Sequence, residues 1–370
     1  HRVRLTMVPD TELSARREKA EAQRLAKIKQ GMEQRQRLEV VKLAGELARR
    51  QEEADDPALL PKVGLEDIPA EMHIASGDAG ELCGRPASFY AQGTNGLVYQ
   101  QVVADLPDLD DELLETLPYY TNALTQLGCA GRDYLDVQAL QTSVSGGVHA
   151  SSSMRGSVED VQRMSGYFVL SGKALVRNHG ALSALMRDSL LEARFDESAR
   201  IREIMAQQRA RREQSVTGNG HGLAMLAAMS GLSSGAALSH RLRGLAGIRH
   251  LKVLDDALDS ENELDQLAGR FEKIHQQIVA APRQFLLVAE AERLSQACEE
   301  VQQAWTGSED NVSAFSAFSP APVNRQVCDA WLTNTQVNFC AKAYPTVPAE
   351  HEDAAALSVL AGFLRNGYLH

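Results

Sequence analysis

The chain has 370 residues, of which 44% are hydrophobic and 24% are charged, and its formal net charge is −11. This composition is ordinary for a globular protein, and its length suits roughly two or three domains. The negative charge argues against a general nucleic-acid-binding protein, which would carry a basic face. The five cysteines form no CxxC pair, so they favour free thiols in a reducing compartment over a disulfide framework.

The first 54 residues predict a helical hairpin. Residues 10–53 are rich in Ala, Glu, Lys, Arg and Gln, which favour helices, and Gly31 divides them into two segments. Each segment carries a sparse apolar stripe, which favours antiparallel packing of the two helices with their outer faces exposed to solvent. Three prolines then follow within thirteen residues, at Pro57, Pro61 and Pro69. They cannot continue a helix, so residues 55–71 are predicted to be an extended linker.

Residues 72–305 predict an α+β domain built on an antiparallel sheet. Strand-forming residues over 88–92 and 97–104 flank a turn at 93–96 and predict a β-hairpin. The other predicted elements are helices over 107–127, 178–194 and 196–215, strands over 137–144 and 147–153, and a mixed helix and strand stretch over 158–170. Residues 223–305 predict nearly continuous helix, interrupted by a short strand at 285–288.

The last part of the chain predicts the beginning of a second α+β domain. Residues 306–322 are rich in Ser, Ala and Pro and are predicted to be a second linker. The truncated domain then spans 323–370, with a strand over 336–343 and an amphipathic helix from about Glu350. Because most of its sheet is absent, an exposed edge and an apolar helix face favour self-association.

No residues of this chain are predicted to bind a metal. A helical zinc site needs two histidines three or four residues apart, and no two of the ten histidines are that close. His351 stands between Glu350 and Glu352, which is typical of an acidic helix start. Asp108, Asp110, Asp111 and Glu112 lack the glycine and the distant acid of a calcium loop, and they also favour a helix start.

Other motifs favour structural interpretations. Residues 231–235 match a nucleophile elbow around Ser233, but a helix precedes them, so a helix-to-helix turn is predicted. Residues 166–174 fail as a phosphate loop, because the glycine spacing is wrong and Ala174 lacks a hydroxyl. The glycine-rich residues 218–222 predict a link between helices, and the basic run 209–212 predicts a solvated helical face.

Three stretches together resemble the presequence-protease branch of the insulinase-like (pitrilysin) metallopeptidases. The first resembles that family's central linker through Gln51, Asp55, Asp56, Pro57, Leu60, Pro61, Leu65, Asp67, Ile68 and Pro69. The second resembles its third domain through Ser215, Gly220, His221, Ala224 and Ala228. The third and most specific resembles the opening of its fourth domain through Asn338, Phe339, Tyr344, Pro345, residues 351–356, Leu360, Phe363, Leu364 and residues 366–370.

The resemblance implies two bowl-shaped halves, each of two α+β domains, closing around a chamber that admits unfolded peptides. It places the zinc in the first domain, on an inverted histidine motif with no counterpart in this chain. It also implies an arginine and a tyrosine of the fourth domain, expected beyond His370. We therefore expect no catalytic residue, no metal ligand and no cofactor here, with zinc in a missing N-terminal half. The resemblance identifies no substrate-binding residue.

These expectations make the chain a fragment that forms one chamber wall and the hinge, inactive on its own. Its expected partners are the N-terminal catalytic half and unfolded peptides, with no nucleic acid and no membrane. The expected location is the bacterial cytoplasm, or the mitochondrial or plastid matrix. Two alternatives stay open. One is a structural protein of the same fold without protease activity, and the other is an adaptor acting through the N-terminal hairpin.

Overall fold

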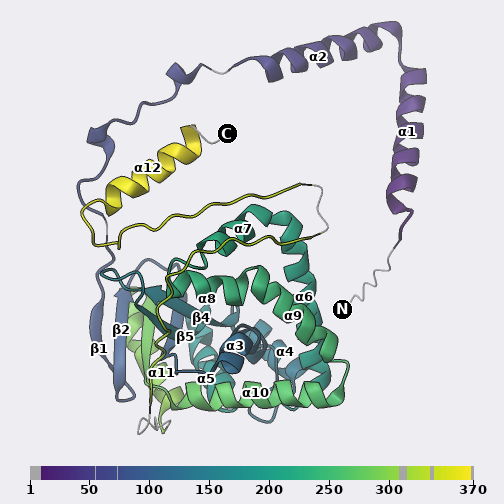
Figure 1. Ribbon diagram of the computed structural model, residues 1–370. Helices are drawn as coiled ribbons and strands as arrows, with labels where there is room; N and C mark the ends of the chain where they lie inside the picture. The colour runs from purple at the N-terminus through teal and green to yellow at the C-terminus, as the bar shows by residue number, and fades with distance from the viewer. Residues whose placement is uncertain (1–9, 55, 73, 308–314, 334–336, 368–370) are drawn as a thin grey trace. The chain divides into compact units, whose positions relative to one another are not determined.

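A computed structural model describes residues 10–54, 56–72, 74–307, 315–333 and 337–367 (Figure 1). The chain divides into two compact units, His1–Ile74 and Ala75–His370. The domain boundaries predicted at 55–71 and 306–322 stay predictions. None of the helices among the described residues is long and apolar enough to cross a lipid bilayer.

The first unit contains the two predicted helices, α1 (Leu13–Gly31) and α2 (Gln34–Glu52). Surface ion pairs such as Arg24–Glu21 and Arg35–Glu39 support them locally. Neither helix has a buried residue, so the predicted antiparallel packing of their apolar stripes is not formed within the described residues. Two short 3₁₀ turns follow in the predicted linker, η1 (Pro57–Leu59) and η2 (Leu65–Asp67).

The second unit is built on a six-stranded sheet in the order β1-β2-β6-β3-β5-β4. The strands are β1 (Asp78–Leu82), β2 (Arg85–Ala91), β3 (Leu97–Asp105), β4 (Val148–Gly156), β5 (Met164–Leu175) and β6 (Arg283–Ala289). All neighbours are antiparallel except β2 and β6, which are parallel. The α+β class is therefore confirmed, and the sheet that was predicted to be antiparallel is mixed, with one parallel pair.

The predicted hairpin of β2 and β3 is also wrong, because β6 lies between these two strands. β6 pairs with β2 through Ser88 and Leu286 and with β3 through Gln101 and Leu286. The loop between β2 and β3 does turn, with positive φ at Asn95 and Gly96. A local turn signal thus predicted the bend correctly, but strand partners are chosen by packing over the whole domain.

Nine helices accompany the sheet in the described part of this unit up to residue 307. They are α3 (Asp111–Leu124), α4 (Tyr134–Val144), α5 (His179–Leu191), α6 (Ser198–Gly218), α7 (Gly220–Met229), α8 (Ser234–Arg243), α9 (Leu245–Ala257), α10 (Glu261–Ala280) and α11 (Ala291–Trp305), with a 3₁₀ turn η3 (Val176–Asn178) before α5. Most match predicted helices. The exception is α4, where a strand was predicted over 137–144. Asp133 caps this helix by accepting a hydrogen bond from the Asp136 backbone N–H at 2.9 Å.

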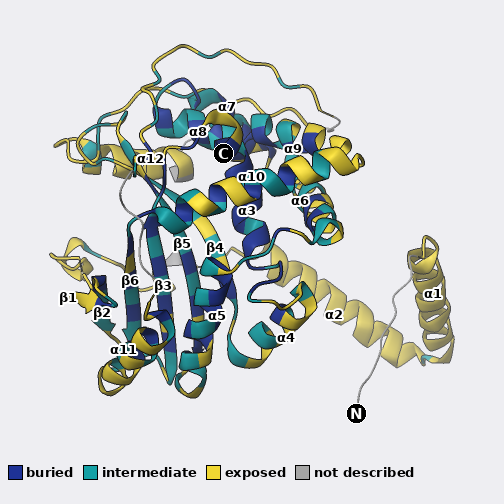
Figure 2. Ribbon diagram, turned by 90° about the horizontal axis from the view of Figure 1, so that it is seen from below, coloured by how far each residue is buried: buried dark blue, intermediate teal, exposed yellow. Residues whose placement is uncertain are grey.

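Helices α5 and α11 lie against one face of the sheet (Figure 2). The strand residues on that face are buried, as Val102, Leu170 and Phe285 show. The two layers approach closely at Gly172, where an added Cβ would lie 2.8 Å from the Leu182 side chain of α5. The core of the domain therefore occupies only one side of the sheet.

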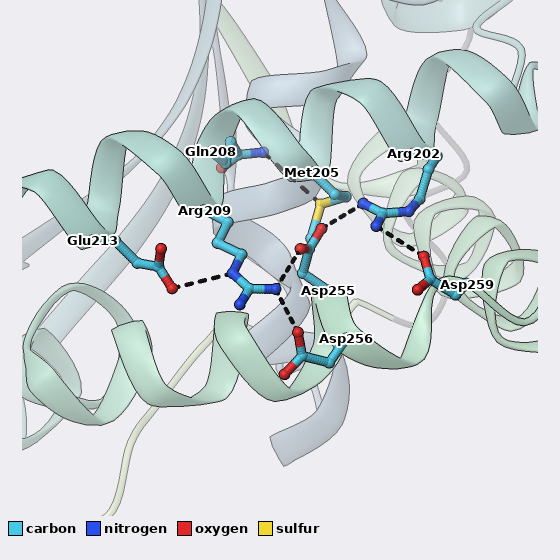
Figure 3. A network of polar contacts seen from close by, with 8 residues as sticks. All are labelled: Arg202, Met205, Gln208, Arg209, Glu213, Asp255, Asp256 and Asp259. Carbon is cyan, nitrogen blue, oxygen red and sulfur yellow. Dashed lines mark hydrogen bonds and ion pairs between the residues drawn. The ribbon is translucent and has the colours of Figure 1, made fainter. Parts of the chain in front are cut away.

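Helices α6 and α9 are joined by a cluster of ion pairs (Figure 3). The buried Asp255 carboxylate accepts from Arg202 at 2.6 Å and from Arg209 at 2.9 Å. Arg209 belongs to the basic run 209–212 that was predicted to be a solvated face. Its charge is instead neutralised by neighbouring acids, and burial lowers the pKa of the neighbouring Arg212. The solvated description therefore does not hold for these two arginines.

The segment after α11 packs back onto the same domain. Ala317 forms a bridge with Pro107, and Phe318 is buried beside Gly166. The Gln162 side chain holds the segment with hydrogen bonds to the backbone N–H and carbonyl of Val323, at 3.0 and 2.9 Å. Part of the predicted second linker, 306–322, is thus ordered against the sheet domain.

The predicted strand over 336–343 is not formed in its described residues, 337–343, because no other strand pairs with them. Residue 336 lies outside the described residues. The predicted amphipathic helix is present as α12 (Ala354–Gly367), beginning about one turn later than expected. Its apolar residues Leu357, Val359, Leu360, Phe363 and Leu364 are exposed.

An aromatic cluster around Tyr120 contains a histidine that should make stability depend on pH. The Tyr120 hydroxyl and His275 Nδ1 are 2.9 Å apart, and the His275 ring stacks edge-on with Phe195. Burial lowers the pKa of His275 to about 4. The unfolded chain then binds an extra proton between the ordinary pKa of about 6.5 and about 4.

We expect the free energy of unfolding to fall by about 2 to 3 kcal/mol as the pH drops through this window. Above the unfolded-state pKa the contribution of His275 is fully present, and it is lost progressively as acid protonates the unfolded chain. Urea unfolding at several pH values measures this slope. A His275→Gln variant should show a shallower slope, and equal slopes for both proteins would contradict the assignment.

Candidate functional site

The residues that were tested as metal or catalytic motifs all have structural roles. Among the described residues, no group of three or more His, Cys, Asp or Glu side chains is arranged to hold a metal ion. His351 Nδ1 accepts from the Asp353 backbone at 3.2 Å, just ahead of α12. Asp110 caps α3 by accepting from the Leu113 backbone at 2.8 Å. Both are the predicted helix starts.

The glycine-rich motifs are likewise structural. Ser233 caps α8, with its hydroxyl accepting from the Ala236 backbone at 3.1 Å, and α7 precedes it in place of the strand that an elbow requires. Lys173 is an exposed residue near the end of β5, within the strand, so no phosphate loop forms around it. Residues 218–222 form the junction between α6 and α7, as predicted.

The sheet face opposite α5 and α11 is more exposed than the face that these helices cover. Side chains alternate between the faces of a strand, and β3 alternates between buried residues and residues that are half-buried or exposed. Where Val102 and Phe168 point into the core, their neighbours Val103 and Tyr167 are only half-buried. This second face, formed mainly by β3, β4, β5 and β6, is called the open face below.

The register of the strands arranges the open face in rows. Ser153 of β4 lies opposite Tyr167 of β5, which lies opposite Asp105 of β3. The next row runs from Ser151 through Val169 and Val103 to Gln284 of β6. The face therefore combines hydroxyl and amide groups with short apolar and aromatic side chains.

A hollow of about 680 Å³ lies on the open face, a size typical of small-ligand and peptide sites. Its lining comes from β3, β4, β5, β6 and the loop between β4 and β5. The lining residues are Gln101, Val103, Ser153, Arg155, Gly156, Ser157, Val158, Arg163, Met164, Ser165, Tyr167, Val169 and Gln284. No carboxylate is among them, although the chain as a whole is strongly acidic.

Asp105 is the nearest acid in the rows of the open face, beside Tyr167 but outside the lining of the hollow. Burial raises the pKa of its carboxyl group. Arg155 and Arg163 are both exposed on the rim. The hollow is therefore a concave, positively charged part of a negatively charged protein, and such a concavity concentrates the field of its charges.

Sequence reasoning identified no residue of this hollow. One usable signal was the alternation of Ser151, Ser153 and Arg155, which places polar groups on one face of β4. The other signal, the strand-forming residues over 97–104, was interpreted only as evidence for a strand. The hollow appears once the pairing of β3 with β5 and of β5 with β4 is known, because its residues are far apart in the chain.

Comparison with known proteins decides the family. Residues 7–254 of the chain match the sequence profile of the associated domain of family M16 peptidases, subfamily C. The chain belongs to this family. The matched region contains α1, α2 and most of the sheet domain, including β4 and β5. It also contains every lining residue of the hollow except Gln284 of β6.

Curated relatives of this peptidase-associated chain carry the name presequence protease. The chain is 28% identical to presequence protease 1, chloroplastic/mitochondrial, from Arabidopsis thaliana, over 76% of the chain and 26% of that protein. It is 22% identical to the mitochondrial presequence protease of Danio rerio, over 100% of the chain and 38% of that protein. The chain thus spans well under half the length of these relatives.

Among solved structures, a peptidase M16 inactive domain from Pseudomonas fluorescens aligns with 66% of the peptidase-associated chain and 54% of its own length. The TM-score is 0.42 and the sequence identity is 19%.

Proposed function

We propose that this peptidase-associated chain is the non-catalytic C-terminal portion of a zinc-dependent metalloendopeptidase that degrades unfolded peptides. In this proposal the open face forms part of one wall of the peptide chamber. The observation that carries it is the asymmetry of the sheet, since α5 and α11 bury one face and the other keeps a polar hollow. The zinc belongs to residues outside this chain.

The proposal also assigns a partner and a location. The partner is the catalytic half of the same polypeptide, and the exposed apolar residues of α1, α2 and α12 are surfaces suited to meeting it. The names of the relatives support a mitochondrial or plastid matrix in a eukaryotic source. A bacterial source would place the protein in the cytoplasm.

A complementation experiment tests the proposal. The parent polypeptide is truncated to remove this segment, and hydrolysis of a quenched fluorogenic peptide is measured. We expect truncation to reduce kcat/KM by about a hundredfold, because a chamber without this wall no longer positions the peptide. Adding the 370-residue chain in trans should restore much of the loss. The chain alone should release no product above background.

Two outcomes would contradict the proposal. If the chain alone bound stoichiometric zinc and hydrolysed the peptide, its assignment as a non-catalytic portion would fail. If the intact parent bound no zinc and left the peptide uncleaved, the structural protein of the same fold would be favoured instead.

A further inference from the structure

We infer that the hollow on the open face binds a carboxylate of an extended peptide, with Arg155 and Arg163 as its cationic ligands. The inference rests on the proposed function, because it names the kind of peptide group that the chamber wall accepts. It goes beyond that function by assigning a site and its chemistry to particular residues.

The first step is the pairing of arginines elsewhere in the domain. Several arginines of the domain form ion pairs with acids, namely Arg132, Arg187, Arg194, Arg200, Arg202, Arg209, Arg241 and Arg270. Arg155 and Arg163 form no ion pair with any described residue. In a chain with a net charge of −11, two uncompensated arginines at one concavity leave local positive charge for a ligand.

The second step is the hydrogen-bonding capacity of the hollow. Arg155 donates from Nε to the Ser153 hydroxyl at 3.2 Å, which fixes one edge of its guanidinium group. The terminal N–H groups then offer the fork that matches a carboxylate, as guanidinium groups do in bidentate pairs. The hydroxyls of Ser157 and Ser165 and the amides of Gln101 and Gln284 add neutral partners nearby.

The third step is the position of nearby acids, which do not neutralise these arginines. The Asp160 carboxylate accepts from the Gln162 backbone at 2.8 Å, and Glu159 is exposed in the same loop. The backbone of Glu350 donates to the Val158 carbonyl at 3.0 Å, so the segment before α12 touches the rim. None of these acids lines the hollow.

The fourth step is the apolar part of the lining, which selects a peptide over a simple inorganic anion. Val103, Val169, Met164 and the Tyr167 ring form an apolar patch between the polar groups. An extended peptide presents side chains on alternating sides, so one side can meet this patch while a carboxylate meets the arginines. Phosphate alone would leave the apolar surface in water.

Fluorescence anisotropy on the 370-residue chain tests the inference with three short peptides that carry a net-neutral dye. The first contains glutamates and a free carboxyl terminus, the second keeps the glutamates but has an amidated terminus, and the third has glutamines and an amidated terminus. We expect the first to bind about tenfold more tightly than the third, because charge-assisted hydrogen bonds are lost with the charge. The second peptide shows whether side-chain or terminal carboxylates supply the contact.

Matched variants locate the contact. Arg155→Gln combined with Arg163→Gln should weaken binding of the first peptide about tenfold and leave the third nearly unchanged. Arg155→Lys with Arg163→Lys should lose less, since the charge stays but the fork is removed. Arg211→Gln alters an exposed arginine of α6 outside the hollow and should change nothing. Thermal unfolding by circular dichroism confirms that each variant is folded.

The inference is overturned if the double glutamine variant binds the first peptide as tightly as the unaltered chain does. It is also overturned if the third peptide binds as tightly as the first, although the chamber-wall proposal would then survive. Failure of all three peptides to bind would instead contradict the proposed peptide-facing role itself.

Discussion

Replacing Asp255 with alanine is expected to lower the free energy of unfolding by about 2 to 4 kcal/mol. The Asp255 side chain is only 5% exposed, and its carboxylate accepts hydrogen bonds from both Arg202 and Arg209 of α6 (Figure 3). Without it, the two guanidinium groups lose their shared acceptor. The loss is smaller than for a fully enclosed pair, because Arg202 keeps Asp259 and Arg209 keeps Glu213.

Urea unfolding followed by circular dichroism measures this change, and Asp259→Asn is the matched control. Asp259 also pairs with Arg202, but its side chain is 82% exposed, so its loss should cost less than about 0.5 kcal/mol. Equal effects of the two substitutions would contradict the view that burial makes Asp255 the centre of the cluster. A variant with Asp255→Asn should fall between them, because one oxygen acceptor remains.

Local signals in the sequence predicted the helices well. The acids at the start of α3 include Asp110, which caps the helix, and the short strand predicted at 285–288 is found as β6. The prediction failed for α4, where a strand was predicted over 137–144. There Asp133 supplies a helix cap, and among the residues of α4 only Val137 is buried. The cap at Asp133 was the signal that the strand prediction missed.

Long-range pairing was beyond the reach of local signals. β6 follows β3 by almost the whole length of the domain, yet it separates β2 from β3 in the sheet. No turn sequence encodes such an insertion, because it depends on which strands bury the most surface together. The same dependence hid the hollow, since Arg155, Tyr167 and Gln284 meet only through the register of four strands.

Replacing Trp305 with alanine is expected to destabilise the sheet domain by about 3 to 5 kcal/mol, the largest single effect we predict. Trp305 ends α11 and is fully buried, with its ring edge-on to Phe285 at a centroid distance of 5.3 Å. Its indole N–H donates to the Ser183 hydroxyl of α5 at 3.2 Å. One side chain therefore joins α11, α5 and the inserted strand β6.

The substitution leaves a large cavity at the point where these three elements meet, and the surrounding structure can close it only in part. Trp305→Phe keeps an aromatic ring against Phe285 but loses the hydrogen bond to Ser183, so its cost should be roughly half as large. Trp331→Ala is the control, because Trp331 is partly exposed and contacts Arg249 and His240 outside the sheet core. If urea unfolding showed the same loss of free energy for Trp305→Ala and Trp331→Ala, the large contribution that we assign to the contacts of Trp305 with α5 and β6 would be wrong.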